Sequence, residues 1–464
     1  MSRKTLKKKA AKRQKRVEKH ARRAGTLHGV SEIRRFFRAN ETPITFVSGT
    51  GFDLLGVDRW VRRFEYVTYD DPFDGHHPHV FAPTRTGRLG STSALEVCNH
   101  LLGHEQVVEH VCRRRGGGKA VVPALDEKTE RLAAEAALEL ASVPAALRAR
   151  LASATEQARL RDKAGIPAVP HVVGRASTYG VLQALSVSAG LGHDLVVQVA
   201  DDPARRTFVV SSESDWQTHA DRLAGQALEV MKRIDGRAVA IAGVVTRHGT
   251  LLGALPAGLS EEQRRQARRC VGLIGERLRQ EGYRGSFELE LLADLDTGAT
   301  YLGTLEPSLA GANSPTHLYA VASGEMPLFL FHLLEFMEVE YELDVDALNA
   351  RMAARDTDEW SRLVLENPDT TGPIAGAPPP TGVWRLDPAA PAGIRFVRRE
   401  TDWRSVGDED EAFFLRGAGA ELGILVARGN LRTDDGEPTE RGRAWIDGIE
   451  QFETGFLPAP AQIR

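Results

Sequence analysis

Histidine and cysteine side chains gather in one segment of the sequence at spacings that could hold a metal ion. His100 and His104 lie four residues apart, which would place both imidazoles on one face of a helix and is compatible with zinc binding. The H-E-x-x-H pattern of zinc proteases is absent, however, and Gly103 falls inside the same segment. Cys98 and Cys112 lie nearby but form no C-x-x-C motif. We interpret these residues as ordinary packing and surface side chains.

Two glycine-rich segments could approach a phosphate group. Gly49-Thr50-Gly51 follows a β-branched run at 43–48 and precedes apolar residues at helical spacing, an order typical of the start of a Rossmann-like unit. The dinucleotide fingerprint G-x-G-x-x-G is not matched, because the next glycine is Gly56. The second segment, 113–118, precedes its strand, whereas a phosphate loop follows a strand and opens a helix. We interpret the first segment as a fold signal and the second as a turn.

The charge of the chain is divided unevenly. The 464 residues carry a formal net charge of -3. Residues 1–25 contain twelve Lys or Arg and one acid, Glu18, a balance of +11 that leaves -14 on the rest, because -3 minus 11 is -14. We expect residues 1–30 to form a disordered basic tail, since like charges repel and the segment has almost no large aliphatic residues. The tail is either a solvated extension or the binding segment for an anionic partner, nucleic acid or an acidic protein.

The composition is that of a globular protein with several packing units. It is 42% hydrophobic and 27% charged, and the longest apolar stretch, 328–337, already contains His332 and Glu335. A helix that crosses a bilayer needs about 20 apolar residues, so we expect no membrane span and no membrane partner. Three cysteines exclude a disulfide framework, and a reducing, cytoplasmic location is the expectation that follows.

Breaks in the pattern of strands and helices divide the chain into units. A Pro-containing break at 165–170 separates a Rossmann-like unit from a second unit, in which two predicted hairpins carry polar loops. The stiff sequence PIAGAPPP marks a later linker. The predicted units are the tail at 1–30, a Rossmann-like domain at 31–150, an α+β domain at 151–345, a linker at 346–381 and a β-rich C-terminal domain at 382–464.

Four segments of the second unit are similar to one family. They are Leu195–Gln198 (LVVQ), Thr246–Thr250 (TRHGT), Gly282–Leu289 (GYRGSFEL) and Thr304–Gly311 (TLEPSLAG). With the Rossmann-like first unit, they make residues 31–337 resemble the ATP-grasp superfamily, in particular bacterial biotin carboxylase-like and carboxylate–amine ligase-like proteins. The resemblance implies an α/β (α+β) fold in which two α+β subdomains form a nucleotide cleft. It also implies ATP and Mg²⁺ as cofactors, and activation of a carboxylate as an acyl phosphate.

The resemblance further implies where the metal ligands lie. Glu290, or Glu288 two residues earlier on the same strand face, stands at the first metal position. The second metal carboxylate falls on Thr304, which is neutral, while Glu306 replaces the asparagine of the family pattern and Ser308 replaces its arginine. Because Mg²⁺ takes hard oxygen ligands, the expected metal ligands are Glu288, Glu290 and Glu306.

The nucleotide is expected to contact two strands and the segments that follow them. The phosphate loop of the family falls on residues 200–207, which contain no glycine but two aspartates and a proline that removes a donor. Two arginines in the same loop partly compensate the acidic charge, and the adenine hinge falls at 231–234. The expected nucleotide-binding residues are Gln198, Arg205, Arg206, Met231, Lys232 and Ile234.

These departures from the family pattern define the functional hypotheses. Removal of one preorganised charge-stabilising group costs about 10²–10³ in rate, so several such losses favour a nucleotide-binding or non-catalytic protein, a pseudoenzyme. One alternative is an active ATP-dependent carboxylate–amine ligase with small-molecule carboxylate and amine substrates. Another is a nucleic-acid-associated protein that acts through its basic tail. The C-terminal strands either cap the cleft or mediate a homodimer.

Overall fold

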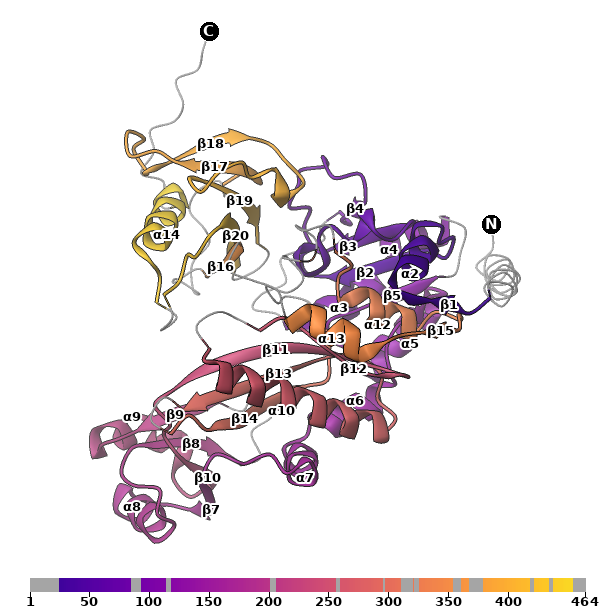
Figure 1. The fold of residues 1–464 in the computed structure, drawn as a ribbon. Helices are drawn as coiled ribbons and strands as arrows, with labels where there is room; N and C mark the ends of the chain where they lie inside the picture. The colour runs from indigo at the N-terminus through magenta and orange to yellow at the C-terminus, as the bar shows by residue number, and fades with distance from the viewer. Residues whose placement is uncertain are drawn as a thin grey trace.

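The computed structural model describes most of the chain (Figure 1). The described residues are 25–84, 93–113, 118–200, 206–255, 259–294, 297–309, 320, 325–353, 360–366, 379–417, 421–433 and 437–453. Three sequence predictions lie wholly or largely outside them: the basic tail, Arg205 with most of the phosphate loop, and the PIAGAPPP segment. Among the described residues, no helix is long and apolar enough to cross a membrane.

The first sheet is five-stranded and parallel, with the strand order β4-β3-β2-β5-β6. Its strands are β2 (Ile44–Ser48), β3 (Phe64–Thr68), β4 (Val80–Phe81), β5 (Lys119–Val121) and β6 (Glu139–Leu140). The helices of this part are α2 (Gly29–Arg38), α3 (Ala94–Gly103), α4 (Glu105–Arg113), α5 (Glu127–Glu135), α6 (Ala145–Ala152) and α7 (Ala154–Ala164). Every residue of β2 and β3 is buried, as a parallel sheet covered on both faces requires. The predicted Rossmann-like fold is confirmed.

The segment after β2 differs from the helix that its apolar spacing predicts. Two 3₁₀ turns, η1 (Phe52–Leu54) and η2 (Val57–Arg59), take the place of a single helix over 52–61. Gly56 separates them with a φ of 93°, a left-handed conformation that interrupts a right-handed helix. The apolar side chains of the segment are nevertheless buried, partly against the C-terminal sheet described below.

The lobe sheet is four-stranded and antiparallel, with the order β7-β10-β8-β9. Its strands are β7 (His171–Arg175), β8 (Leu195–Val199), β9 (Thr207–Val210) and β10 (Ala227–Lys232). Helices α8 (Tyr179–Ser188) and α9 (Glu213–Leu223) bury one face, where Leu182 and Leu223 pack among the inward residues of the strands. The opposite face is open, since Val173 is 62% exposed and Val209 is 44% exposed.

The central sheet is also four-stranded and antiparallel, with the order β12-β11-β13-β14. Its strands are β11 (Gly236–Thr246), β12 (Gly249–Leu252), β13 (Gly285–Asp294) and β14 (Thr300–Glu306), and its helices are α10 (Glu261–Gln280), α12 (Phe329–Glu335) and α13 (Val345–Ala353). Helix α10 covers one face, and its inward residues share the largest core cluster with β11, β13 and the first sheet. Strands β1 (Leu27–His28) and β15 (Tyr341–Glu342) form a small parallel pair.

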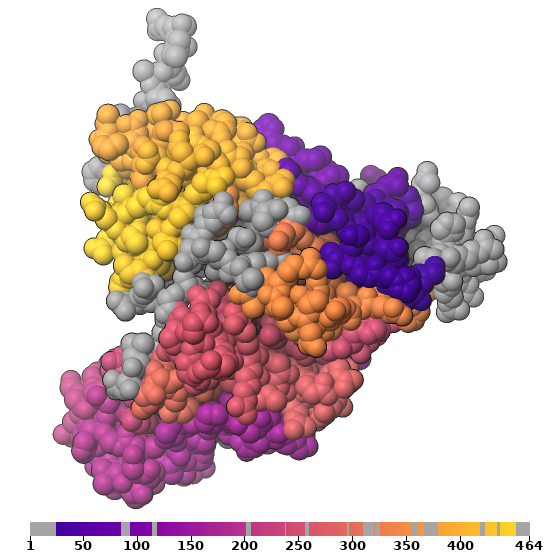
Figure 2. All heavy atoms as spheres, in the orientation of Figure 1, coloured from indigo at the N-terminus to yellow at the C-terminus, as the bar shows by residue number. Residues whose placement is uncertain are grey.

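The C-terminal sheet is five-stranded and antiparallel, with the order β16-β20-β19-β17-β18. Its strands are β16 (Trp360–Glu366), β17 (Gly382–Leu386), β18 (Ile394–Arg398), β19 (Glu411–Arg416) and β20 (Glu421–Arg428), with the turn η4 (Trp403–Ser405) and helix α14 (Glu440–Glu453). Strand β16 comes from the segment 346–381, which the sequence presents as a linker. In the space-filling view, the yellow C-terminal part lies in the upper half of the molecule and the magenta lobe at the bottom (Figure 2).

The C-terminal sheet and the first sheet share a hydrophobic core. Phe52 and Phe73, from the loops after β2 and β3, are buried in one cluster with Trp360 and Trp403 of the C-terminal part. Salt bridges surround this contact, for example Arg59 with Asp402 at 2.6 Å. The loops at the carboxyl ends of two parallel strands are therefore packed directly beneath the C-terminal sheet.

Candidate functional site

The three predicted metal ligands lie on the uncovered face of the central sheet. Glu288 is the cross-strand partner of Glu306, and Glu290 is the partner of Thr304. Leu289, between the two glutamates of β13, is fully buried, so the glutamates point to the opposite face. Directly opposed residues in an antiparallel pair have Cβ atoms about 4.5–5.5 Å apart. We refer to Glu288, Glu290 and Glu306 as the acid row.

A bulge sets which residues of the acid row oppose one another. The register shifts between Glu290 and Leu291, and Gly303 is the extra residue of β14. As a result, the Thr304 hydroxyl donates a hydrogen bond to Glu290 Oε2 at 3.1 Å. A neutral hydroxyl thus faces Glu290, and the pair of opposed carboxylates, Glu288 and Glu306, lies next to it on the same face of the sheet.

The acid row is electrostatically unfavourable for Glu288. Glu288 is half-buried, whereas Glu290 and Glu306 are exposed. Burial is the main cause that raises the pKa of Glu288, and the negative charges of Glu290 and Glu306 raise it further. A cation beside the row would stabilise the ionised form of Glu288.

The acid row fits a Mg²⁺ ion that is shared with a phosphate ligand. Among the described residues, no three His, Cys, Asp or Glu side chains are grouped so that they alone could hold a metal ion. Mg²⁺ usually keeps several waters and is bound through one or two carboxylates together with substrate phosphates. Two opposed carboxylates, Glu288 and Glu306, match that requirement. His100 and His104, by contrast, contact each other edge to face, with ring centroids 5.7 Å apart.

Two predicted nucleotide-binding residues lie on the open face of the lobe sheet. Gln198 belongs to a polar row, in which its Nε2 donates to Thr207 Oγ1 at 2.8 Å, and Met231 belongs to the neighbouring, more apolar row. The first row is Val173, Glu229, Gln198 and Thr207, and the second is His171, Met231, Val196 and Val209. The open face therefore offers a polar and an apolar stripe side by side.

The other predicted nucleotide-binding residues lie at the ends of the lobe strands. Strand β10 ends at Lys232 and β11 begins at Gly236, so Ile234 lies on the short connection between the lobe sheet and the central sheet. The backbone N–H of Lys232 donates to Pro170 O at 2.9 Å, which ties this connection to the other chain segment that enters the lobe. Arg206 is exposed and immediately precedes β9.

Sequence reasoning missed a basic residue that completes this site. Arg362, in β16, has its Cζ 5.9 Å from the ring centroid of Phe52, which follows the glycine turn of the first sheet. Its positive charge opposes the rise in the pKa of Glu288, so it lies near the acid row. No sequence signal marks Arg362, because its strand lies within the segment that reads as a linker.

Helix α7 holds the end of the acid row in place. The Gln157 side chain donates through Nε2 to Leu305 O at 2.7 Å and accepts from Leu305 N at 3.3 Å. It thus satisfies both backbone groups of the residue before Glu306, on the free edge of β14. Gln157 therefore fixes the backbone directly before Glu306, from the edge of the sheet.

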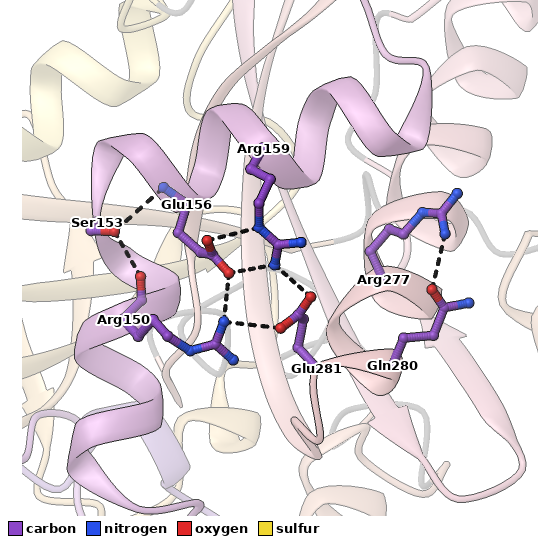
Figure 3. A network of polar contacts seen from close by, with 7 residues as sticks. All are labelled: Arg150, Ser153, Glu156, Arg159, Arg277, Gln280 and Glu281. Atoms are coloured by element: carbon purple, nitrogen blue, oxygen red, sulfur yellow. Dashed lines mark hydrogen bonds and ion pairs between the residues drawn. The ribbon is translucent and has the colours of Figure 1, made fainter.

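An ion-pair network ties the same helix to the end of α10 (Figure 3). Arg159 contacts both Glu156 and Glu281, and Arg150 binds the same two acids at 2.6 and 2.9 Å. Glu281 directly follows α10, and α7 leads into the lobe. Isolated surface pairs contribute little to stability, but a network of two arginines and two glutamates fixes geometry more firmly. The root of the lobe is thereby anchored to the central sheet.

Comparison with known proteins supports the fold. No protein-family model and no curated protein matches the chain. An N5-carboxyaminoimidazole synthase from Aspergillus clavatus, solved with ADP and 5-aminoimidazole ribonucleotide, superposes with a TM-score of 0.51 at 13% identity, covering 89% of this chain and 98% of that one. An L-amino acid ligase from Bacillus licheniformis gives 0.49 at 14% identity, covering 89% and 97%. The biotin carboxylase subunit of a pyruvate carboxylase gives 0.49 at 10% identity, covering 84% and 87%.

The similarity concerns the fold, because the identities are low. The synthase aligns over nearly its whole length with this chain. The chain therefore has the ATP-grasp fold, and the α/β architecture expected from the sequence is confirmed.

Proposed function

We propose that the chain is an ATP-dependent ligase of the ATP-grasp type, which binds MgATP between the open face of the lobe sheet and the acid row. The observation that carries this proposal is the direct opposition of Glu288 and Glu306 on the uncovered face of the central sheet. Two carboxylates held side by side repel each other unless a cation lies between or beside them. A bound nucleotide would bring that cation with its phosphates.

The nucleotide would lie along the two stripes of the lobe sheet. The apolar stripe that contains Met231 suits a planar base, and Lys232 and Ile234 flank it on the connection to the central sheet. Gln198 supplies an amide in the polar stripe, and the exposed Arg206 stands near the loop expected to cover the phosphates. The similar fold of a synthase solved with ADP supports a nucleotide here.

The residues around the acid row would have separate roles in the reaction. Bound Mg²⁺ would neutralise the terminal phosphates so that a substrate carboxylate can attack the γ-phosphorus, release ADP and form an acyl phosphate. Glu288 and Glu306 would hold the metal. Arg362 would stabilise the negative charge of the transferred phosphoryl group, a role for which a guanidinium is suited. An amine would then displace the phosphate.

The proposal is tested by nucleotide turnover in the presence of candidate substrates. The full chain is incubated with MgATP and pools of carboxylates and amines, and release of ADP and phosphate is measured. We expect release above that of a Glu288→Gln, Glu306→Gln double variant, which keeps the shape of both side chains but removes their charge. Release equal to that of the variant in every pool would reject the ligase function for those substrates.

A second function, nucleotide binding without turnover, is favoured by one contact. The hydroxyl of Thr304 takes the position at which the family pattern has a metal carboxylate, and it hydrogen-bonds to Glu290. A single metal ion held by Glu288 and Glu306 would allow binding while leaving the phosphoryl group less well neutralised. Calorimetry that shows Mg²⁺-dependent ATP binding, combined with no turnover in the assay above, would identify this function.

The remaining expectations concern location and partners. Two of the three thiols, Cys98 and Cys270, are free and buried, and burial raises the pKa of the Cys98 thiol to about 12. Unpaired thiols of this kind fit a reducing compartment, so we place the protein in the cytoplasm. The basic tail would add an electrostatic contact to nucleic acid or an acidic protein, which its deletion would abolish.

A further inference from the structure

A row of exposed acids runs through β15 into the first turn of α13. Its five members occupy alternate positions, and every residue between two of them is buried or half-buried, so the five carboxylates share the solvent side. We refer to this row as the acidic strip, which consists of Glu338, Glu340, Glu342, Asp344 and Asp346. The strip places a dense line of negative charge on the surface.

Only two members of the strip have a basic partner among the described residues. Arg247 Nη1 lies 3.0 Å from Glu340 Oε2, and His28 Nδ1 lies 3.0 Å from Glu342 Oε2. One arginine does not balance five carboxylates, and a surface with charge of one sign attracts a partner of the opposite sign. The strip therefore suits a cationic partner.

The backbone of the strip is fixed by the turn between β11 and β12. His248 Nε2 donates to Tyr341 O at 2.7 Å, and the guanidinium of Arg247 lies 4.7 Å from the Tyr341 ring centroid. The Tyr341 hydroxyl donates to the buried carboxylate of Glu335. A partner that binds the strip would thus meet carboxylates on a rigid support, which lowers the entropic cost of binding.

Strand β1 brings the end of the basic tail to the strip. Leu27 pairs with Tyr341 and His28 with Glu342 in a parallel register, and Leu27 N donates to Glu340 O at 2.9 Å (Figure 1). Because the two strands are parallel, the chain before Leu27 approaches from the side of Glu338. That chain is the tail of residues 1–25, with its balance of +11. The most basic segment of the sequence therefore joins the fold at the strip.

The length of the tail is sufficient for contact with the whole strip. An extended chain of 24 residues reaches about 80 Å, whereas the nine residues of the strip span about 30 Å. Attachment next to the strip also holds the tail at an effective concentration in the millimolar range. Contacts that would be too weak between separate molecules can form under these conditions.

We propose that residues 1–25 dock on the acidic strip of their own chain, and that an external anion must displace the strip to bind the tail. The contact is electrostatic, between lysines and arginines of the tail and exposed carboxylates of the strip. Such contacts are weakened by salt. The proposal does not depend on the ligase function.

The contact is tested by zero-length crosslinking of the full chain with a carbodiimide, which joins a lysine amine to a carboxylate that touches it. Seven of the eleven lysines of the chain lie in the tail, so the products identify the docked segment. A mixture of protein with and without ¹⁵N separates crosslinks within one copy from those between copies. We expect mass spectrometry to find tail lysines joined to the strip within one copy at about 20 mM salt, and to lose these products at about 500 mM salt.

A second measurement compares charge variants, because a glutamine cannot form the crosslink. Trypsin cleaves after lysine and arginine, so the rate at which it degrades the tail reports how often the tail is free. The strip variant should lose its tail about fivefold faster than the wild type at low salt, since each exposed ion pair contributes a few tenths of a kcal/mol. The strip variant carries Glu338→Gln, Glu340→Gln and Asp346→Asn.

A matched variant removes three exposed acids from the first positions of α4, α9 and α10, which changes the net charge by the same amount. It carries Glu105→Gln, Glu213→Gln and Glu261→Gln and should lose its tail at the wild-type rate. Unfolding midpoints show that both variants are folded. The proposal is overturned if tail lysines crosslink equally to acids elsewhere, crosslink only between copies, or form no crosslink, or if both variants lose the tail at the same rate. Absence of all crosslinks would leave the tail free for nucleic acid or another external anion.

Discussion

Glu288 faces Glu306 across two adjacent antiparallel strands, so two carboxylates stand side by side on the uncovered face of the central sheet. One of the two, Glu288, is half-buried, and the positive charge of Arg362 in the C-terminal sheet partly opposes the rise in its pKa. The arrangement is unfavourable for the isolated protein and favourable for a protein that holds a cation. Under the proposed function, a bound metal and its phosphates would restore the stability that this position costs the protein without ligand.

Glu288→Gln should stabilise the protein at neutral pH in the absence of Mg²⁺. The folded state raises the pKa of Glu288, so it binds a proton at pH values at which the unfolded chain has lost it. Stability therefore falls as pH rises through this range, and the penalty persists above it. We expect the variant to unfold about 2 °C higher at pH 7 and to show no gain near pH 4. A lower midpoint at pH 7 would contradict the electrostatic account of the acid row.

Thr304→Glu should create a second opposed pair, with Glu290, and increase metal-dependent ATP binding. The substitution places a carboxylate where the hydroxyl now donates to Glu290 Oε2. Without Mg²⁺, the extra repulsion should lower the unfolding midpoint. With MgATP, calorimetry should show tighter binding, by about tenfold if one additional metal ligand is gained. Thr304→Gln is the neutral control of equal size, and equal binding by the two variants would exclude a metal ligand at this position.

Arg362→Gln should impair turnover more than nucleotide binding. Arg362 stacks near Phe52 and lowers the pKa of Glu288, so its removal should leave the acid row less ionised and the phosphoryl group less neutralised. Loss of one charge-stabilising group should reduce kcat by about 10²–10³. The measurement is kcat and KM for ATP, with Arg362→Lys as the variant that keeps the charge. A change in KM alone would assign Arg362 to ground-state binding.

Gly275→Ala should destabilise the protein, whereas Gly272→Ala, on the same helix, should not. A Cβ at Gly275 would lie 2.3 Å from Thr250 Oγ1, but a Cβ at Gly272 meets nothing within 4 Å. Overpacking of α10 against β12 should cost about 1–3 kcal/mol. The matched change at Gly272 should add about 0.5–1 kcal/mol through helix propensity. Urea unfolding measures both, and equal effects would show that α10 does not pack closely on β12.

His332→Phe should lower stability and remove part of its dependence on acid pH. The buried imidazole accepts from Ser286 N at 2.9 Å and contacts Ala141 O at 2.9 Å, which links α12, β13 and the segment after β6. Burial lowers the pKa of His332 to about 4, so its stabilising contribution is complete above the unfolded value of 6.5 and is lost as pH falls toward 4.

The aromatic substitution would leave two backbone groups unsatisfied, at a cost of about 2–4 kcal/mol. Unfolding free energies measured at pH 7 and pH 5 should therefore differ less for the variant than for the wild type. His332→Gln, which keeps polar atoms without titrating in this range, should lie between them in stability. An unchanged pH dependence in His332→Phe would show that another group titrates.

The fold and the acid row could be predicted because both depend on short-range patterns. Alternation of apolar and polar residues along β13 already places Glu288 and Glu290 on one face, and the turn that follows fixes an antiparallel partner. The sequence does not show, however, which residue of β14 faces which residue of β13. It is the bulge at Gly303 that places Glu306 opposite Glu288, because without this extra residue Leu305 would take that position.

The basic residue of the site could not be predicted for a related reason. Arg362 comes from a supposed linker, and that segment has no pattern that suggests function. Its charge acts on the acid row only because separate sheets pack together. The helix expected after β2 is absent for a similar cause, since Phe52 and Leu55 are buried by contact with a sheet more than 300 residues later in the chain.

The shared core beneath the C-terminal sheet has a consequence for how the protein can be divided. Phe52 and Phe73 on one side and Trp360 and Trp403 on the other bury each other's apolar surface. A fragment that ends before β16 would expose this patch to water and would tend to aggregate. Proteolysis between α13 and β16 should accordingly yield two pieces that stay associated, and each half expressed alone should require the other to remain in solution.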